Sequence, residues 1–480
     1  MDIKYRKWSK QDCRTLFESM RGVLTIKEPQ FYFPIMSLFF YIHNTPNSHR
    51  VIDFKRKHYI QCIHSSKSIK EYTSNQIINA TIQDTIEACC EKRDLFMKTI
   101  PLLDPVHYLL NNYNRSVHRN PLLPSNYSFN TSVKLNDMNN MAYIDVFFSF
   151  IASQLSVSDK NPSFPIYYGS VTSLGSYKHD ITDDLNELKN HEGFRQIMKH
   201  IQIDEYTSDK NSVHSSVTSI SGSSTGSGSS TDSDCSDYIA TFQNYPIIQL
   251  FLEKLDGTLE DIIHDKMDIP LLKSCLFQIT FALTYLQKHY YFTHNDLHIN
   301  NVMFIKTKKP YLYYKYNNQY FKVPTYGYLF KIIDFGRSIF TFRKKTYMND
   351  AFSKYGEAEG QYTHPPQVSF LKTDTSDIIY PSYHFDLCRL AITMIDEIRY
   401  NHDDELEDDD EYQDFLDFLK YLVTDKNGVR LDKQEDSFDL YIQISRTAQN
   451  SLPRDILVNT FFYDYRIKKK SFPKSSGYTI

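Results

Sequence analysis

The sequence predicts a mixed α+β fold, in which a smaller sheet-rich part precedes a larger helical part and long insertions interrupt both. Three observations favour this class. Strand-like apolar runs flank a helical stretch within residues 85–252, a long helical pattern covers residues 269–290, and two more helical patterns follow residue 380.

The first half has the order strand, helix, strand. Residues 85–103 (TIEACCEKRDLFMKTIPLL) are interpreted as two adjacent strands, and residues 139–155 have helical periodicity with an aromatic face. A buried strand is expected at Ile247–Leu252. The main part of residues 207–237 is almost pure Ser, Gly, Thr and Asp, which cannot repay the entropy of ordering, so we expect a disordered insert there.

The second half begins with a long buried helix, predicted at Ile269–Tyr290. Strand-like runs then bound a polar loop within residues 290–307, and another strand-like run lies within residues 329–339. Between these runs, residues 306–329 alternate aromatic and polar side chains about Asn317-Asn318, which predicts a protruding hairpin.

Composition and charge favour a protein of the cell interior. Hydrophobic residues make up 41% of the 480 residues and the net charge is −4, so we expect no membrane contact and no nucleic-acid partner. The seven cysteines lack CxxC or metal-ligand spacing and are interpreted as free thiols. The longest apolar run, Phe31–Ile42, is too short to span a membrane, and the N-terminus lacks a signal-peptide stretch. We expect an intracellular, cytoplasmic location, with a nuclear one as the alternative because of the basic run Arg466–Lys470.

Two short motifs indicate the chemistry. In residues 294–301 (HNDLHINN) an Asp stands two residues after a His, and an Asn five residues after that Asp; residues 334–336 (DFG) follow on the next strand. Phosphoryl transfer needs an anion to orient the attacking hydroxyl, oxygen ligands for metal ions and a cation on the nucleotide. With these motifs at this spacing, the chain resembles the protein-kinase superfamily.

The resemblance implies a bilobal protein kinase-like fold with a small β-rich N-lobe and a larger helical C-lobe. Residues 1–60 would be an N-terminal extension packed on the N-lobe. Residues 61–252 would form the N-lobe, with the Ser-rich insert at about 207–237. Residues 253–480 would form the C-lobe, with the hairpin insert at about 306–329.

The resemblance also implies roles at the catalytic loop, with ATP and Mg²⁺ as cofactors. Asp296 would be the base that accepts the proton of the substrate hydroxyl, while Asn301 and Asp334 would hold two Mg²⁺ ions. His298 stands where serine/threonine kinases usually place a Lys near the γ-phosphate.

The candidate for the lysine that binds the nucleotide is Lys98, because Leu-Phe-Met-Lys at residues 95–98 resembles the family's strand sequence Val-Ala-Ile-Lys. Lys199 is the competing candidate. The expected partner of Lys98 is Asp145, where the family normally has Glu. Backbone groups from Glu253 to Leu255 would contact adenine at the hinge.

Several positions depart from the family pattern. No Gly occurs between Gly22 and Gly169, so the glycine-rich loop over the phosphates is missing, and residues 79–81 (NAT) are expected to form that turn. Asn295 replaces the Arg that usually binds an activation-loop phosphate, so activation by loop phosphorylation is not expected. The resemblance is retained at Asp386, which should brace the catalytic loop from a helix.

The motif Asp-Leu-His at 296–298 is similar to haspin-type protein kinases and also to aminoglycoside- and choline-type kinases. With the aromatic insert and Asn295, the chain also resembles the protein kinases of large DNA viruses, which would place it in host cytoplasm or virion. We expect a serine/threonine protein kinase, with a small-molecule kinase or a pseudokinase scaffold as alternatives. The acidic run at residues 403–417 favours a basic protein substrate, and nothing indicates the oligomeric state.

Overall fold

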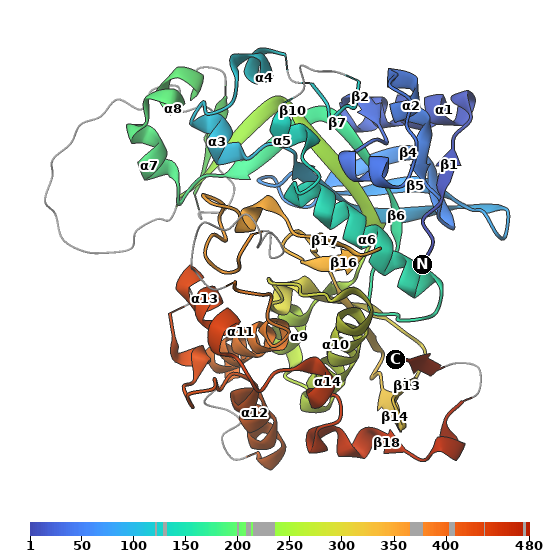
Figure 1. Ribbon diagram of the computed structural model, residues 1–480, viewed down its shortest axis with the longest axis vertical. Helices are drawn as coiled ribbons and strands as arrows, with labels where there is room; N and C mark the ends of the chain where they lie inside the picture. Colours follow the sequence, from blue (N-terminus) through green and yellow to red (C-terminus); the bar gives the residue numbers. More distant parts are fainter. Residues whose placement is uncertain are drawn as a thin grey trace, which may run out of the picture. The chain divides into compact units, whose positions relative to one another are not determined.

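The computed structural model has a mixed α+β fold (Figure 1). Its contacts divide the chain into two units. The first comprises Met1–Met138 and Tyr167–Lys254, and the second comprises Asn139–Ile166 and Leu255–Ile480. The structure describes all residues except 121, 128–131, 199–200, 208–212, 215–235, 365–377, 403–408, 436 and 474–476. Most of the Ser-rich insert, the candidate Lys199 and part of the acidic run therefore lie outside the described residues.

The first unit is built on an eight-stranded sheet with the order β2-β7-β10-β6-β5-β4, in which β8 pairs with β10 and β9 pairs with β8. A separate pair joins β1 and β3. The strands of this unit are β1 (Tyr5–Lys7), β2 (Lys27–Gln30), β3 (Ile52–Phe54), β4 (His58–Ser68), β5 (Gln76–Asp84), β6 (Cys89–Pro101), β7 (Tyr167–Asp180), β8 (Gln202–Thr207), β9 (Val213–His214) and β10 (Ser236–Glu253). Its helices are α1 (Lys10–Leu24), η1 (Pro34–Leu38), α2 (Pro46–Val51), α3 (Pro105–Leu109), α4 (Arg115–Arg119), α5 (Val133–Asn136), α7 (Leu185–Asn190) and α8 (Glu192–Ile197).

Two local predictions in this sheet are wrong. Residues 85–103 contain one long strand, β6, and not two, because its pairing partner β5 lies upstream. Residues 79–81 are not a turn but the middle of β5, where Asn79 Nδ2 donates to Asp94 Oδ1 across the strands at 2.8 Å. The turn before β5 is formed by residues 69–75. The predicted strand Ile247–Leu252 is confirmed as part of the longer β10.

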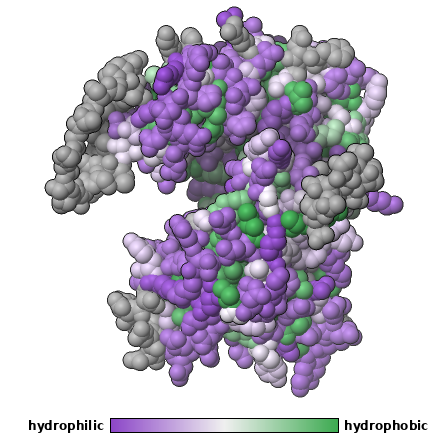
Figure 2. Space-filling view, turned by 60° about the vertical axis from the view of Figure 1, so that its left-hand side comes forward, coloured by the Kyte–Doolittle hydropathy of each residue, from purple (hydrophilic) through white to green (hydrophobic). Residues whose placement is uncertain are grey.

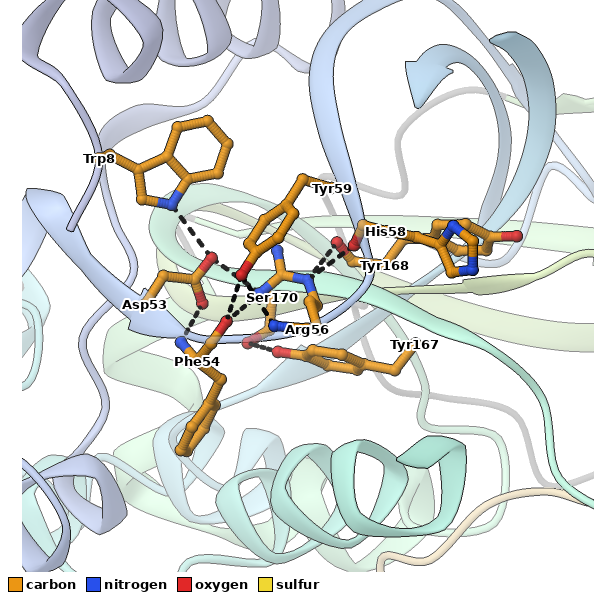
Figure 3. Close-up of polar contacts among 9 residues, drawn as sticks. All are labelled: Trp8, Asp53, Phe54, Arg56, His58, Tyr59, Tyr167, Tyr168 and Ser170. Atoms are coloured by element: carbon orange, nitrogen blue, oxygen red, sulfur yellow. Dashed lines mark hydrogen bonds and ion pairs between the residues drawn. The ribbon is translucent and has the colours of Figure 1, made fainter. Parts of the chain in front are cut away.

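A buried ion pair ties the N-terminal residues of this unit to β7 (Figure 3). Arg56 Nη1 donates to Asp53 Oδ2 at 2.8 Å, and each side chain is only 3% exposed. The indole nitrogen of Trp8 donates to the same carboxylate at 3.3 Å, and Arg56 Nε donates to the carbonyl of Tyr168 at 2.9 Å. At the next residue, Gly169 has φ +151°, and a Cβ there would lie 2.8 Å from Arg56 Nη2. Glycine is therefore required at this close approach.

The second unit contains α6 (Met141–Val157) and the elements after Lys254. Its helices there are α9 (Leu259–Lys266), α10 (Ile269–Tyr290), η3 (Ile299–Asn301), η4 (Asp350–Phe352), α11 (Phe385–His402), α12 (Asp410–Leu422), η5 (Leu431–Lys433), α13 (Phe438–Thr447), α14 (Pro453–Ile456), η6 (Thr460–Tyr465) and η7 (Lys469–Ser471). Its strands are β11 (Gly257–Thr258), β12 (Val302–Lys306), β13 (Tyr311–Tyr316), β14 (Gln319–Pro324), β15 (Tyr328–Ile332), β16 (Phe340–Phe342), β17 (Lys345–Tyr347), β18 (Arg466–Ile467) and β19 (Gly477–Thr479).

The predicted long helix is confirmed as α10, with the bounds expected from its periodicity. The side chain of Asp268 caps its N-terminus by accepting from the Leu271 N–H at 3.0 Å. By length and composition α10 could cross a membrane, with a mean hydropathy of 1.4 over its most apolar stretch, but 89% of that stretch is buried within the structure. Core helices of soluble proteins pass the same test, so this is weak evidence for a membrane span.

The predicted hairpin about Asn317-Asn318 is present as β13 and β14, but it does not protrude. Tyr314 and Phe321 are fully buried, and their rings lie 5.4 and 5.0 Å from the ring of Phe277 on α10. On its two edges the hairpin pairs with β18 and β19, which completes a four-stranded sheet. The alternation of aromatic and polar residues thus indicates a sheet that packs one face against the hydrophobic core.

The surface is largely hydrophilic on the face shown in Figure 2, with hydrophobic residues scattered among polar ones. Many of the exposed large side chains are tyrosines, including Tyr41 and Tyr400, which are 84% and 88% exposed. A tyrosine ring can stay in water because its hydroxyl remains solvated.

Candidate active site

Strand pairing in the second unit brings two motif residues together. β12 and β15 are antiparallel, with Val302 opposite Ile332, and the Ile333 N–H donates to the Asn301 carbonyl at 3.1 Å. Asn301 immediately precedes β12, and Asp334 follows β15 by two residues. The polar loop and the Asp-Phe-Gly motif therefore meet at the same end of the paired strands β12 and β15 in the three-stranded sheet β11-β12-β15.

The loop is braced from α11, as predicted for Asp386. This carboxylate is fully buried and accepts the backbone N–H groups of His294 and Asn295, each at 2.9 Å. Burial raises the pKa of Asp386, and the His294 charge and these backbone donors oppose the rise. Asn295 has a left-handed backbone, with φ +63°, and its Nδ2 donates to the Arg337 carbonyl at 3.0 Å. Asn at this position therefore connects the loop to the segment that follows Asp-Phe-Gly.

Asp296 is held through one of its two carboxylate oxygens. The hydroxyl of Tyr441 donates to Oδ1 at 2.9 Å, and Arg337 Nη1 lies 3.8 Å from the same atom. Within the described part of the chain, Oδ2 has no hydrogen-bond partner, and the side chain is 27% exposed. Asp296 thus presents one unoccupied oxygen in a fixed orientation.

Tyr441, which no motif identifies, is itself tightly held on α13. Its ring centroid lies 5.7 Å from that of Phe385, and the guanidinium of Arg389 lies 4.9 Å from it. Burial raises the pKa of Tyr441, and the negative charge of Asp296 raises it further. The hydroxyl therefore remains a hydrogen-bond donor at neutral pH.

Asn301 links the loop residues internally. Its Nδ2 donates to the Asp296 carbonyl at 2.9 Å and contacts His298 Nε2 at 3.0 Å. Since an amide nitrogen can only donate, Nε2 must accept, which requires a neutral imidazole. Burial lowers the pKa of His298, although the Asp296 carboxylate opposes this shift. With its nitrogen so engaged, Asn301 Oδ1 has no partner among the residues that the structure describes.

Asp334 has a left-handed backbone, with φ +63°, and its Oδ1 accepts from the Gly336 N–H at 3.4 Å. The intervening Phe335 N–H donates at 3.1 Å to Asp145 on α6. Asp145 is only 2% exposed and also accepts from the Ser149 hydroxyl at 3.3 Å. The structure therefore brings Asp145 to the Asp-Phe-Gly segment.

The remaining predicted residues lie on or next to the first unit. Lys98 is half-buried on β6 opposite Leu250, and burial raises the pKa of Tyr177 to about 12 while the charge of Lys98 opposes that rise. Glu253 ends β10, and Leu255 begins the second segment of the second unit. Because Lys98 and Asp145 belong to different units, their pairing stays a prediction.

The oxygen atoms around the loop fit a magnesium ion. Asn301 Oδ1 is without a partner in the described structure, and Asp334 supplies a carboxylate just after the end of the neighbouring strand β15. Among the described residues no three His, Cys, Asp or Glu side chains cluster as a metal site. Mg²⁺ commonly binds through one or two carboxylates plus substrate phosphates and water, so a small protein ligand set suits it.

No family model matches the chain, and no curated protein matches its sequence. Among solved structures, the chain is similar to "ROP18 kinase domain in complex with AMP-PNP and sucrose", with 11% sequence identity and a TM-score of 0.30. The match covers 84% of this chain and 79% of that chain. A likeness this distant carries no argument about function, so the class of protein depends on the site itself.

Proposed function

We propose that the protein is a kinase-like phosphotransferase that moves the γ-phosphoryl group of ATP to a hydroxyl. The observation that carries this proposal is the arrangement of Asp296, whose Oδ1 is fixed by Tyr441 while Oδ2 has no partner in the described structure. Asn301 lies beside it, and Asp334 follows the adjoining strand. An oriented base next to oxygen ligands is what phosphoryl transfer requires of a protein.

In this mechanism Asp296 Oδ2 accepts the hydrogen bond of the acceptor hydroxyl and takes its proton as the hydroxyl oxygen attacks the γ-phosphorus. The bond from that phosphorus to the β,γ-bridging oxygen breaks, and ADP leaves. Tyr441 is a positioning residue, because its hydrogen bond fixes which oxygen faces the acceptor. Mg²⁺, held by Asn301 and Asp334, would neutralise charge on the phosphates. Neutral His298 orients the Asn301 amide so that its oxygen is available as a ligand.

For the nucleotide we propose Lys98 at the phosphates, with Asp145 as its partner, and the backbone of Glu253 and Leu255 at the adenine. Asp145 also acts within the second unit, since it accepts the Phe335 N–H and thereby supports the conformation of the Asp-Phe-Gly segment.

The acceptor that we propose is a serine or threonine of a protein. Asp296 is 27% exposed, so a side-chain hydroxyl can reach it. A pseudokinase scaffold is the second candidate, and one observation favours it: the turn of residues 69–75 between β4 and β5 contains no glycine. Without glycine, backbone N–H groups cannot approach a phosphate as closely.

The test is phosphosite mapping by mass spectrometry after the purified chain is incubated with Mg-ATP, a mixed peptide library and small hydroxylated metabolites. The variant Asp296→Asn should transfer phosphate about 100-fold more slowly, because it removes the base. The matched control is Asp439→Asn, an exposed carboxylate on α13. Undiminished transfer by Asp296→Asn would contradict the proposal. Nucleotide binding without any transfer by the wild type would favour the scaffold.

A further inference from the structure

The sheet of the first unit carries a cavity of about 470 Å³. It is lined by Met97 and Thr99, the neighbours of Lys98 on β6. Because successive side chains of a strand point to opposite faces, the cavity lies on the face that does not carry Lys98. Its volume is within the range of small-molecule sites. The cavity is therefore separate from the residues assigned to the nucleotide.

The cavity has an apolar floor. Met97 and Ile247 line it, and each is only 1% exposed; Ile26, next to β2, is 4% exposed. A floor of this kind can hold the carbon skeleton of a ligand.

Two glutamine side chains above this floor have unused hydrogen-bonding atoms. Gln76 stands opposite Met97, and Gln249 opposite Thr99, so register places both on the cavity face. Gln249 is only 2% exposed; its Oε1 accepts from the Ser173 hydroxyl at 3.2 Å, and its Nε2 has no partner in the described structure. Gln76 Oε1 is buried and likewise has no partner there. Buried polar atoms are normally paired, so the orphaned Gln76 Oε1 points to a ligand with a hydroxyl donor, and Gln249 Nε2 offers a donor to the same ligand.

The charge of the lining favours an anion. Lys27 and Lys178 line the cavity, and no Asp or Glu is among the described residues that line it. Lys27 Nζ donates to Asn244 Oδ1 at 2.7 Å, and Lys178 Nζ donates to the backbone carbonyl of Glu71. An ammonium group has three protons, so each lysine retains donors for a ligand.

We propose that this cavity binds a small hydroxylated anion with the chemistry of a sugar phosphate. The hydroxyls donate to Gln76 Oε1 and accept from Gln249 Nε2, while the anionic group pairs with the lysine ammonium groups. The site goes beyond the proposed phosphotransferase function and does not depend on it, since it uses the other face of the sheet.

The test is isothermal titration of the full chain with glucose-6-phosphate, ribose-5-phosphate and glycerol-3-phosphate, with glucose as the uncharged counterpart. We expect saturable binding of at least one phosphate ester, weaker binding of glucose, and no displacement by saturating ATP. The double variant Lys27→Met, Lys178→Met should weaken binding at least about tenfold, because it removes charged hydrogen bonds. The control is Lys92→Met, an exposed lysine on β6 outside the cavity.

Thermal unfolding without ligand should give the same midpoint for the double variant as for the wild type, since Lys27 is exposed and Lys178 is only partly buried. If the double variant proves unstable, Gln249→Met provides an independent test, because it removes the Nε2 donor and keeps a similar volume, at the cost of the Ser173 hydrogen bond to Oε1. The proposal is overturned if none of the three phosphate esters binds, if glucose binds as tightly as its phosphate, or if the stable variant binds undiminished.

Discussion

Replacing Tyr441 with Phe removes a single hydroxyl beside Asp296, the proposed base. The lost contacts are the 2.9 Å hydrogen bond to Asp296 Oδ1 and the hydrogen bond between the hydroxyl and Arg389, while Phe keeps the ring contacts with Phe385 and Arg389. The variant therefore alters the orientation of the Asp296 carboxylate and leaves the ring packing of α13 in place.

The magnitude follows from the partner's charge and exposure. Hydrogen bonds to a charged group contribute about 1.5 to 3 kcal/mol. Because the Asp296 side chain is 27% exposed, water replaces part of the lost bond, and Arg337 Nη1 remains 3.8 Å away. We therefore expect a loss just below this range, about 1.4 kcal/mol, which corresponds to a tenfold fall in kcat.

The assay is steady-state phosphate transfer to an acceptor peptide identified by phosphosite mapping. The value of kcat should fall about tenfold and the KM for ATP should stay unchanged, since the contact concerns only the acceptor side. Tyr400→Phe, at an 88% exposed residue of α11, is the matched control. An unchanged kcat in Tyr441→Phe would refute the reasoning, because the hydrogen bond would then not orient Asp296. A higher kcat would also refute it, because the Tyr441 hydroxyl would then compete with the acceptor hydroxyl.

Three further variants test other contacts. Burial lowers the pKa of His298, so the unfolded chain binds the proton at a higher pH than the folded chain does, and the free energy of unfolding falls as pH drops below about 6.5. His298→Gln should reduce this dependence of the free energy of unfolding on pH, measured by urea titrations between about pH 7.5 and 5.5. Asp145→Leu leaves the buried Phe335 N–H without this acceptor and should lower the free energy of unfolding by about 2 kcal/mol. Asp145→Asn keeps an acceptor oxygen and should lower it by less. Equal losses in the two variants would contradict the role of the hydrogen bond. Gly169→Ala places a methyl group 2.8 Å from a buried guanidinium nitrogen at φ +151° and should cost about 1 to 3 kcal/mol by thermal unfolding, while Gly22→Ala, in open space on α1, should not destabilise.

Sequence patterns correctly predicted those parts of the fold whose structure is determined by one short segment of the chain. The helix Ile269–Tyr290 follows from its spacing of apolar residues, and the support of the loop at His294 and Asn295 by Asp386 follows from its motif. The position of β5 could not be deduced in this way. Asn79 has the side chain of a turn residue, yet Asp94 on the neighbouring strand satisfies it, and that partner is known only after the strands are paired.

The candidate site shows the same division. Asp296, Asn301 and Asp334 stand in motifs, so their residue types and spacing are enough to select them as candidates. The contact of Tyr441 with Asp296 joins residues far apart in the chain, and it depends on how α13 packs. No local pattern carries that information, because an aromatic residue on an amphipathic helix is most often part of the core.

The four-stranded sheet around β13 and β14 has a consequence for protein synthesis. Both outer partners of this hairpin, β18 and β19, lie within residues 466–479, far beyond the hairpin in the sequence. The ribosome therefore synthesises them long after the hairpin itself. Until then the two strands have unpaired backbone groups on their outer edges, and such edges attract other chains. A product shortened by residues 466–480 should therefore tend to aggregate even though every motif residue is intact.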